Sequence, residues 1–198
     1  MDQDRRTRLA PDERRRQLVA LGVASLVDRP LDALTIEHLA GQAGVSRGLL
    51  FYYFGSKQGL HREVVLAARD GMLNATRPEA DLAPLDRLHS TLARTVQFVR
   101  DHRGTFYSLV RGAASGDPEV REVVEQARVE QADRVIAVFL ELGMPDTELL
   151  RIALRSWVAF AEEALVEGAL TTAMPSEDIV VFLERTAWAV AASVAPPA

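Results

Sequence analysis

The chain has 198 residues, 48% of them hydrophobic, which is enough for one or two small domains with a hydrophobic core. Cysteine is absent, which excludes disulfides and thiolate chemistry, and no apolar run approaches the roughly 18 residues of a membrane-spanning helix. The first residues lack the apolar core of a signal peptide, so we expect a cytoplasmic protein that does not enter membranes.

The charge of the chain is unevenly distributed. The net charge is −5, but residues 1–60 hold nine Lys and Arg against seven Asp and Glu, whereas the remaining residues hold 14 against 21. A weakly basic first part joined to an acidic second part is typical of a DNA-binding domain attached to a domain with another role. Such an asymmetry also arises by chance, so the charge supports DNA binding without establishing it.

The first ten residues are polar and rich in arginine. We interpret them as a flexible arm, which either contacts DNA or is simply a disordered tail. A helix is predicted from Pro11, because a proline and the acids Asp12 and Glu13 suit the first turn of a helix. Residues 28–30, Asp-Arg-Pro, end this helix.

Residues 35–57 predict two short helices separated by a tight turn. Thr35 is a suitable N-cap for the first helix, whose apolar residues recur at helical spacing. Gly44 supplies the positive φ that ends this helix, and Ser46 caps the second one. Two helices joined in this way form a helix-turn-helix, whose second helix enters the major groove of DNA.

The same stretch resembles the signature of the tetracycline-repressor (TetR) family of transcriptional regulators. The positions that match the family pattern are Thr35, Ala40, Ala43, Gly44, Val45, Ser46, Gly48, Leu50, Phe54, Lys57 and Leu60. Leu39 replaces an isoleucine of the pattern, Phe51 replaces a tyrosine, and Pro30 lies near the position of a common glycine. The resemblance covers the stretch up to Leu60, and beyond it extends only to the all-helical plan of the family.

The second short helix is predicted to pack one face in the core and to present the other to DNA. Leu50 and Phe54 face the core, which leaves the opposite face for DNA. Arg47 is placed in the first turn to donate two hydrogen bonds to guanine, and Gly48 permits a close approach of the backbone. The DNA-binding residues that the resemblance implies are Thr35, Ser46, Arg47, Gly48, Phe51, Tyr52 and Lys57.

Lys57 is the only lysine of the chain. It lies at the start of a helix, where the helix dipole disfavours a cation, so its position indicates that an anion such as a DNA phosphate lies nearby. Tyr52 offers a hydroxyl group to a phosphate, whereas Phe51 has none, which leaves that contact open. Packing is the alternative role of Phe51, and it is the role that we expect of Tyr53.

The rest of the chain predicts helices and no strand, so the fold class is all-α. A linker helix is expected from Ser56 to about Ala75, and five more helices at about 84–101, 103–113, 118–142, 146–168 and 176–194. The expected domains are the arm at 1–10, a helix-turn-helix DNA-binding head at 11–57, and a helical effector-binding and dimerisation body at 58–198.

The last two predicted helices are apolar on more than one face, and a helix with two apolar faces needs two partners. Pairing of two copies in a four-helix bundle satisfies this need, and members of the family usually dimerise in this way. The alternative is a fully internal helix. Because an operator with two half-sites needs two heads, we expect a homodimer. The predicted interface residues are Leu154, Trp157, Val158, Ala161, Leu165, Phe182, Leu183, Thr186 and Val190.

The family plan also implies a cavity for a small-molecule effector inside the body. The candidate lining residues are Phe98, Phe106, Tyr107, Val110, Arg111, Phe139 and Trp157. Tyr107 and Arg111 lie one helical turn apart and offer polar groups, although Arg111 is equally consistent with a solvated side chain. Each of these residues taken singly is also consistent with the hydrophobic core.

Nothing in the sequence indicates an enzyme. The four histidines form no metal-binding pair, and there is no phosphate-binding loop or nucleophile motif. We therefore predict no catalytic residue, no metal and no cofactor. The prediction is a dimeric DNA-binding regulator, a repressor released from an inverted-repeat operator by a small molecule. The alternatives are an activator, a helical-bundle enzyme and a non-specific architectural DNA binder, for which we expect a more basic chain.

Overall fold

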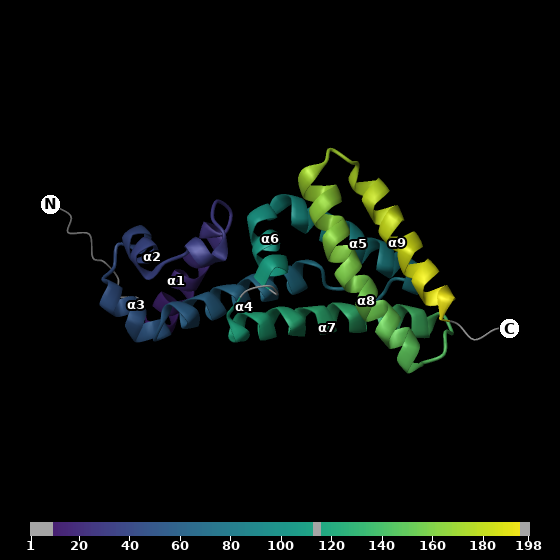
Figure 1. Ribbon diagram of the computed structural model, residues 1–198, viewed down its shortest axis with the longest axis horizontal. Helices are drawn as coiled ribbons and strands as arrows, with labels where there is room; N and C mark the ends of the chain where they lie inside the picture. The colour runs from purple at the N-terminus through teal and green to yellow at the C-terminus, as the bar shows by residue number, and fades with distance from the viewer. Residues whose placement is uncertain (1–9, 113–115, 195–198) are drawn as a thin grey trace.

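The computed structural model describes residues 10–112 and 116–194, which form an elongated molecule whose regular elements are all helical (Figure 1). The predicted all-α class is therefore confirmed. Of the predicted arm, residues 1–9 lie outside the described residues. Within the described ranges, no helix is both long and apolar enough to span a membrane.

The head consists of short helices packed around a small apolar core. Its elements are α1 (Pro11–Ser25), the 3-10 turn η1 (Leu31–Ala33), α2 (Ile36–Ala43) and α3 (Arg47–Phe54). Leu18 of α1, Leu39 of α2 and Leu50 of α3 are completely buried and hold these helices together. The two short helices of the head therefore begin and end within a residue of their predicted bounds.

The helix α4 (Lys57–Ala75) runs from the head into the body, where it lies against α7 (Figure 1). Its first half packs on α1, and Gly22 permits this close packing because a Cβ atom there would lie 2.4 Å from Cγ2 of Val64. At its carboxyl end, Arg134 of α7 donates hydrogen bonds to the carbonyl oxygens of Leu73 and Thr76. One continuous helix thus joins the two parts of the molecule.

The body consists of the helices that follow α4, of which α5, α6 and α7 pack against it. They are α5 (Pro84–Asp101), α6 (Arg103–Gly112), α7 (Pro118–Glu141), α8 (Glu148–Leu165), the π-helical turn η2 (Val166–Thr171) and α9 (Ser176–Ser193). The helices α8 and α9 form an antiparallel pair at one end of the molecule (Figure 1). The predicted bounds agree with these helices except at α8, which ends in the π-helical turn.

The start of α8 also differs from the prediction. Thr147 caps this helix, because its hydroxyl oxygen accepts a hydrogen bond from the amide of Leu150. Asp146, which was expected to start the helix, instead accepts two hydrogen bonds of 2.7 Å from Arg151. These bonds lower the pKa of the Asp146 carboxyl group, and Asp146 therefore ties the loop before α8 to its first turn.

Candidate nucleic-acid interface

Local hydrogen bonds define the turn between α2 and α3. The hydroxyl oxygen of Thr35 accepts from the amide of His38 at 3.1 Å, and that of Ser46 accepts from the amide of Leu49 at 3.2 Å. Gly44 adopts the left-handed conformation with φ of 63°, and the following amide of Val45 donates to the carbonyl of Ala40. The predicted caps and glycine turn are therefore present, and they set the angle between the two helices.

One face of α3 is buried in the head and the other is exposed. Leu50 and Phe54 lie in the core, as predicted. On the opposite face, Arg47 and Gly48 are exposed, and Tyr52 is the most exposed of the large hydrophobic side chains that the structure describes, with 79% of its surface accessible. This arrangement leaves the amino-terminal turn of α3 free to approach a DNA groove.

The predicted base-reading residue Arg47 forms only a weak contact within the protein. Its guanidinium lies 3.5 Å from the carboxylate of Glu37 on α2, and the two side chains are 68% and 62% exposed. An ion pair as exposed as this contributes little free energy, because water competes for both charges. Arg47 can therefore exchange Glu37 for a base edge. The sequence analysis did not foresee this pair, because it lies between helices and no helical spacing signals it.

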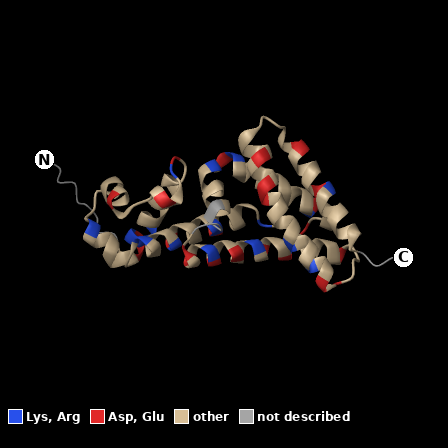
Figure 2. Cartoon of the chain, viewed as in Figure 1, with Lys and Arg blue, Asp and Glu red and all other residues tan. Residues whose placement is uncertain are grey.

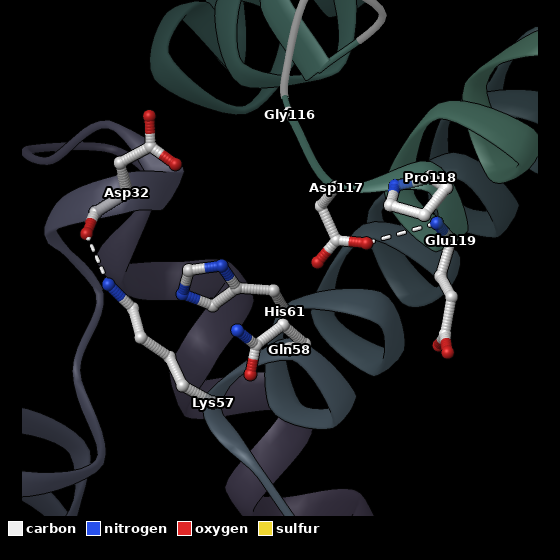
Figure 3. A pocket seen from close by; sticks show the side chains of 8 residues that line it. All are labelled: Asp32, Lys57, Gln58, His61, Gly116, Asp117, Pro118 and Glu119. Atoms are coloured by element: carbon white, nitrogen blue, oxygen red, sulfur yellow. Dashed lines mark hydrogen bonds between the residues drawn. The ribbon is translucent and has the colours of Figure 1, made fainter.

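The predicted phosphate-binding residue Lys57 is oriented by the head itself. Its ammonium donates a hydrogen bond of 2.8 Å to the carbonyl oxygen of Asp32 (Figure 3). The acceptor is a backbone atom of the segment before α2, so no side-chain pattern could have revealed it. An ammonium group has three hydrogens, and the two that remain are available to a phosphate.

The aromatic residues of α3 have different environments. Tyr52 and Tyr53 form an edge-to-face pair with ring centroids 5.3 Å apart, and Tyr53 is half-buried, in agreement with its expected packing role. Phe51 is 48% exposed beside them. Thus Phe51 lies on the open face with the other candidates, and its ring offers an apolar contact in place of a hydrogen bond.

The structure divides the predicted effector-pocket residues among three places. Phe106 and Trp157 line a partly enclosed cavity of about 50 Å³ between α5, α6, α7 and α8. Phe139 is completely buried and packs edge-to-face on Trp188, and Tyr107 lines an open hollow beside the end of α1. Phe98 and Val110 are half-buried against the core. The side chain of Arg111 lies outside the described residues.

Most of the predicted dimer-interface residues are buried inside the protomer. They are Leu154, Trp157, Val158, Ala161, Leu165 and Leu183. Thr186 is half-buried and accepts a hydrogen bond from Nε1 of Trp157, and Val190 is half-buried against the core. Only Phe182 of the predicted set is exposed. The prediction selected the inner faces of these helices, because both faces are apolar.

The outer face of α8 and α9 carries a separate apolar stripe. We call Leu149, Ile152, Phe160 and Phe182 the α8–α9 stripe; each is at least 43% exposed. The rings of Phe160 and Phe182 lie 5.8 Å apart across the two helices. Figure 2 shows that much of this helix pair carries no charge, whereas the two signs alternate along α7. A surface of this composition is typical of a protein interface.

A capped helix-turn-helix with an exposed reading face, carried on a larger helical body, defines a class of DNA-binding regulators. Residues 18–64 match the family model described as bacterial regulatory proteins of the tetR family. Residues 84–190, more than half of the chain, match the model of the tetracyclin repressor-like C-terminal domain. The chain therefore belongs to the TetR family and is a DNA-binding transcriptional regulator.

Individual relatives agree with this assignment. The transcriptional repressor KstR2 of Mycolicibacterium smegmatis is 22% identical over 90% of this chain and 78% of its own length. The regulator YxbF of Bacillus subtilis is 26% identical over 59% of this chain, but the match spans only 31% of YxbF. The activator FasR of M. smegmatis is 36% identical over 37% of this chain and 33% of its own length.

Solved structures show the same fold. A TetR-family regulator from Streptomyces coelicolor superposes with a TM-score of 0.78, covering 93% of this chain and 85% of that one at 23% sequence identity. A transcriptional regulator from Pseudomonas aeruginosa PAO1 superposes with a TM-score of 0.75, covering 96% and 97% at 19% identity. The helical plan is therefore shared where the sequences have diverged widely.

Proposed function

We propose that the chain is a homodimeric, non-enzymatic repressor that reads an inverted-repeat operator through α3 and leaves it when a small molecule binds the body. The observation that carries this proposal is the exposed face of α3, with Arg47 in its first turn and Leu50 and Phe54 anchored beneath it. In this proposal residues 11–57 form the DNA-binding domain and residues 58–198 the effector-binding and dimerisation domain. The protein would act on chromosomal DNA in the cytoplasm.

Two heads would place their α3 helices in successive major grooves, about 34 Å apart or somewhat wider. Arg47 and Ser46, with the backbone at Gly48, read base edges in this arrangement. Contacts from Thr35, Tyr52 and Lys57 to phosphates set the register of the protein on DNA. The hydroxyl oxygens of Thr35 and Ser46 accept hydrogen bonds as helix caps, so each hydroxyl hydrogen is still available to the nucleic acid.

The second copy would cover the α8–α9 stripe. Burial of exposed leucine, isoleucine and phenylalanine side chains provides the hydrophobic free energy that association needs. The variant Phe160→Glu places a charge in this surface, and we expect it to sediment as a monomer. Val129→Glu is the matched control, because Val129 is equally exposed on α7, outside the stripe. If Phe160→Glu remained dimeric, the stripe would not be the interface.

Release by an effector would follow from different affinities of the small molecule for two arrangements of the body. The partly enclosed cavity between α5, α6, α7 and α8 is the proposed site, because its aromatic and aliphatic walls suit a small organic molecule. Such a ligand would favour a dimer whose heads no longer match the spacing of the two half-sites.

Selection of genomic DNA fragments by the purified protein near physiological salt tests the proposal. An enriched inverted repeat supports a sequence-specific dimer, whereas weak, salt-sensitive binding without enrichment favours the non-specific alternative. A reporter gene behind the selected operator then distinguishes the repressor from the activator. Repressors and activators both occur among the relatives, since KstR2 is a repressor and FasR an activator.

A further inference from the structure

The partly enclosed cavity of the body is predominantly apolar. Its walls include Leu88 and Leu92 of α5, Phe106 of α6, Val135 of α7, and Trp157 and Leu165 of α8. Its volume of about 50 Å³ holds little more than a water molecule, and an engineered cavity that admits benzene measures about 150 Å³. An organic ligand therefore enters only if the helices around the cavity move apart.

One hydroxyl group in this lining has no partner. The Oγ1 atom of Thr91 is buried and forms no hydrogen bond with any described group. The neighbouring polar groups are satisfied, because Thr95 donates to the carbonyl of Thr91 at 2.8 Å and Nε1 of Trp157 donates to Thr186 at 3.0 Å. A buried hydroxyl without a partner is unfavourable, so a ligand oxygen that bonded to Thr91 would remove a penalty that the empty cavity carries.

The charged groups beside the cavity form ion pairs with one another. Glu162 is the one charged residue of the lining, and both of its oxygens accept hydrogen bonds from Arg128, at 3.1 and 2.7 Å. These bonds raise the pKa of Arg128, which also donates to Glu125 at 2.7 Å. Two carboxylates thus surround one guanidinium, so an anionic ligand finds no unpaired cation and a cationic ligand finds no free carboxylate.

The cavity also borders a residue that contacts the linker helix. Gln131 of α7 lies in the lining, and its amide nitrogen is 3.9 Å from the sulfur of Met72 on α4. Expansion of the cavity therefore acts on the contact between α7 and the helix that leads to the head. This contact gives a ligand a physical route by which to change the position of α4.

We propose that this cavity binds an uncharged, largely apolar effector with one hydroxyl or carbonyl oxygen, which forms a hydrogen bond with Thr91. The inference rests on the proposed effector-controlled function and names the ligand chemistry of that site. Aromatic ligands fit the walls that Phe106 and Trp157 provide. Binding enlarges the cavity, and the enlarged body is the form that releases DNA.

Four compounds with one carbon skeleton test this chemistry on the full-length protein: benzyl alcohol, toluene, benzoate and benzylamine. Binding is measured at neutral pH by thermal shift and by tryptophan fluorescence, since Trp157 lines the cavity. We expect benzyl alcohol to bind about tenfold more tightly than toluene, and the two charged compounds not to bind. Tighter binding of benzoate or benzylamine, or no binding of benzyl alcohol, would overturn the proposal.

Three variants locate the contact. Thr91→Val should reduce the affinity for benzyl alcohol to that of toluene, whereas the matched control Thr95→Val should keep the preference, because its hydroxyl already bonds to the backbone. Ala161→Leu fills the cavity and should abolish binding of both compounds while operator binding persists. If Thr91→Val keeps the preference, or the filled variant still binds, the assignment of the site is wrong.

Operator release, measured in parallel, separates the two proposals. If benzyl alcohol binds through Thr91 but the operator complex persists, the ligand chemistry stands and the effector function of the cavity fails. If benzyl alcohol releases the operator equally from the protein and from Ala161→Leu, release occurs through another site and the inference fails.

Discussion

Arg47 of the head and two arginines of the body are held in different ways. In the head, Arg47 is mostly exposed and pairs weakly with Glu37. In the body, Arg134 binds the carbonyl oxygens at the end of α4, and Arg128 joins α7 to α8 through Glu162. Partly buried arginine pairs of this kind fix helix positions, whereas exposed pairs exchange partners at little free-energy cost.

This difference separates two tasks within one chain. A side chain that reads DNA must break its contact within the protein when the operator binds. A weak intramolecular contact therefore favours function. A body that transmits the effect of a ligand must keep its helices in defined positions, so stronger contacts favour function there. Substitutions that alter these contacts therefore distinguish the two regions.

Gly104 of α6 lies where the body contacts the end of α1, and we expect no larger residue to fit there. A Cβ atom there would lie 2.0 Å from the carbonyl oxygen of Leu26, at the end of α1, and a backbone atom cannot rotate away. We expect Gly104→Ala to lower the free energy of unfolding by about 3 kcal/mol and to weaken operator binding, as measured by urea denaturation and DNA titration. Gly71→Ala is the control, because its Cβ meets no atom within 4 Å and it should be neutral or stabilising. Equal behaviour of the two variants would contradict the close contact.

Removal of Arg128 should destabilise the body rather than the head. Arg128→Met leaves the partly buried carboxylate of Glu162 without its partner, and we expect a loss of about 2 kcal/mol in unfolding free energy. This is less than for a fully buried pair, because both groups retain contact with water. The double variant with Glu162→Leu should recover most of the stability. If Arg128→Met were as stable as the parent protein, the ion pair would not stabilise the packing of α7 on α8.

Arg47→Ala should weaken binding to the cognate operator by about 1–3 kcal/mol and relax the base preference at one position of each half-site. The measurement is a titration against operators with single base changes. Arg47→Lys is the control, because it keeps the positive charge but cannot form the bidentate hydrogen bonds to guanine. It should therefore lose base preference and keep the salt dependence of binding. An Arg47→Ala variant with unchanged affinity and preference would assign base reading to another residue.

Lys57→Ala should weaken binding evenly across DNA sequences. Loss of one phosphate contact makes the slope of log affinity against log salt shallower by about 0.9. The measurement is a salt titration with specific and random DNA. A steeper loss on the operator than on random DNA would mean that the contact of Lys57 with the Asp32 carbonyl positions the base-reading helix instead.

Glu37→Gln tests the weakness of the contact that holds Arg47 in the free head. It removes a negative charge 3.5 Å from the guanidinium. We expect a gain of a few tenths of a kcal/mol in operator affinity, and little change in stability. A clear loss of affinity would show that Glu37 orients Arg47 for DNA.

The head was predictable because its structure is encoded locally. Thr35, Gly44 and Ser46 each act on atoms within five residues along the chain, so the bounds of α2 and α3 follow from short patterns. The partners of Arg47 and Lys57 were missed, because Glu37 lies on another helix and Asp32 contributes a backbone oxygen 25 residues away.

The helices, their order and the residues of the candidate DNA-reading face can be predicted from the sequence alone, because caps, glycine turns and helical periodicity are local properties. Which apolar face of α8 and α9 points inward depends instead on how the helices pack. Leu154 and Leu183 are completely buried, whereas Ile152 and Phe182 are about half exposed, although all four are equally apolar in sequence. The lining of the cavity also depends on packing. Trp157 and Phe139 were both predicted to line it, but only Trp157 does. The reason is that periodicity marks a face as apolar, while the neighbouring helices determine what that face contacts.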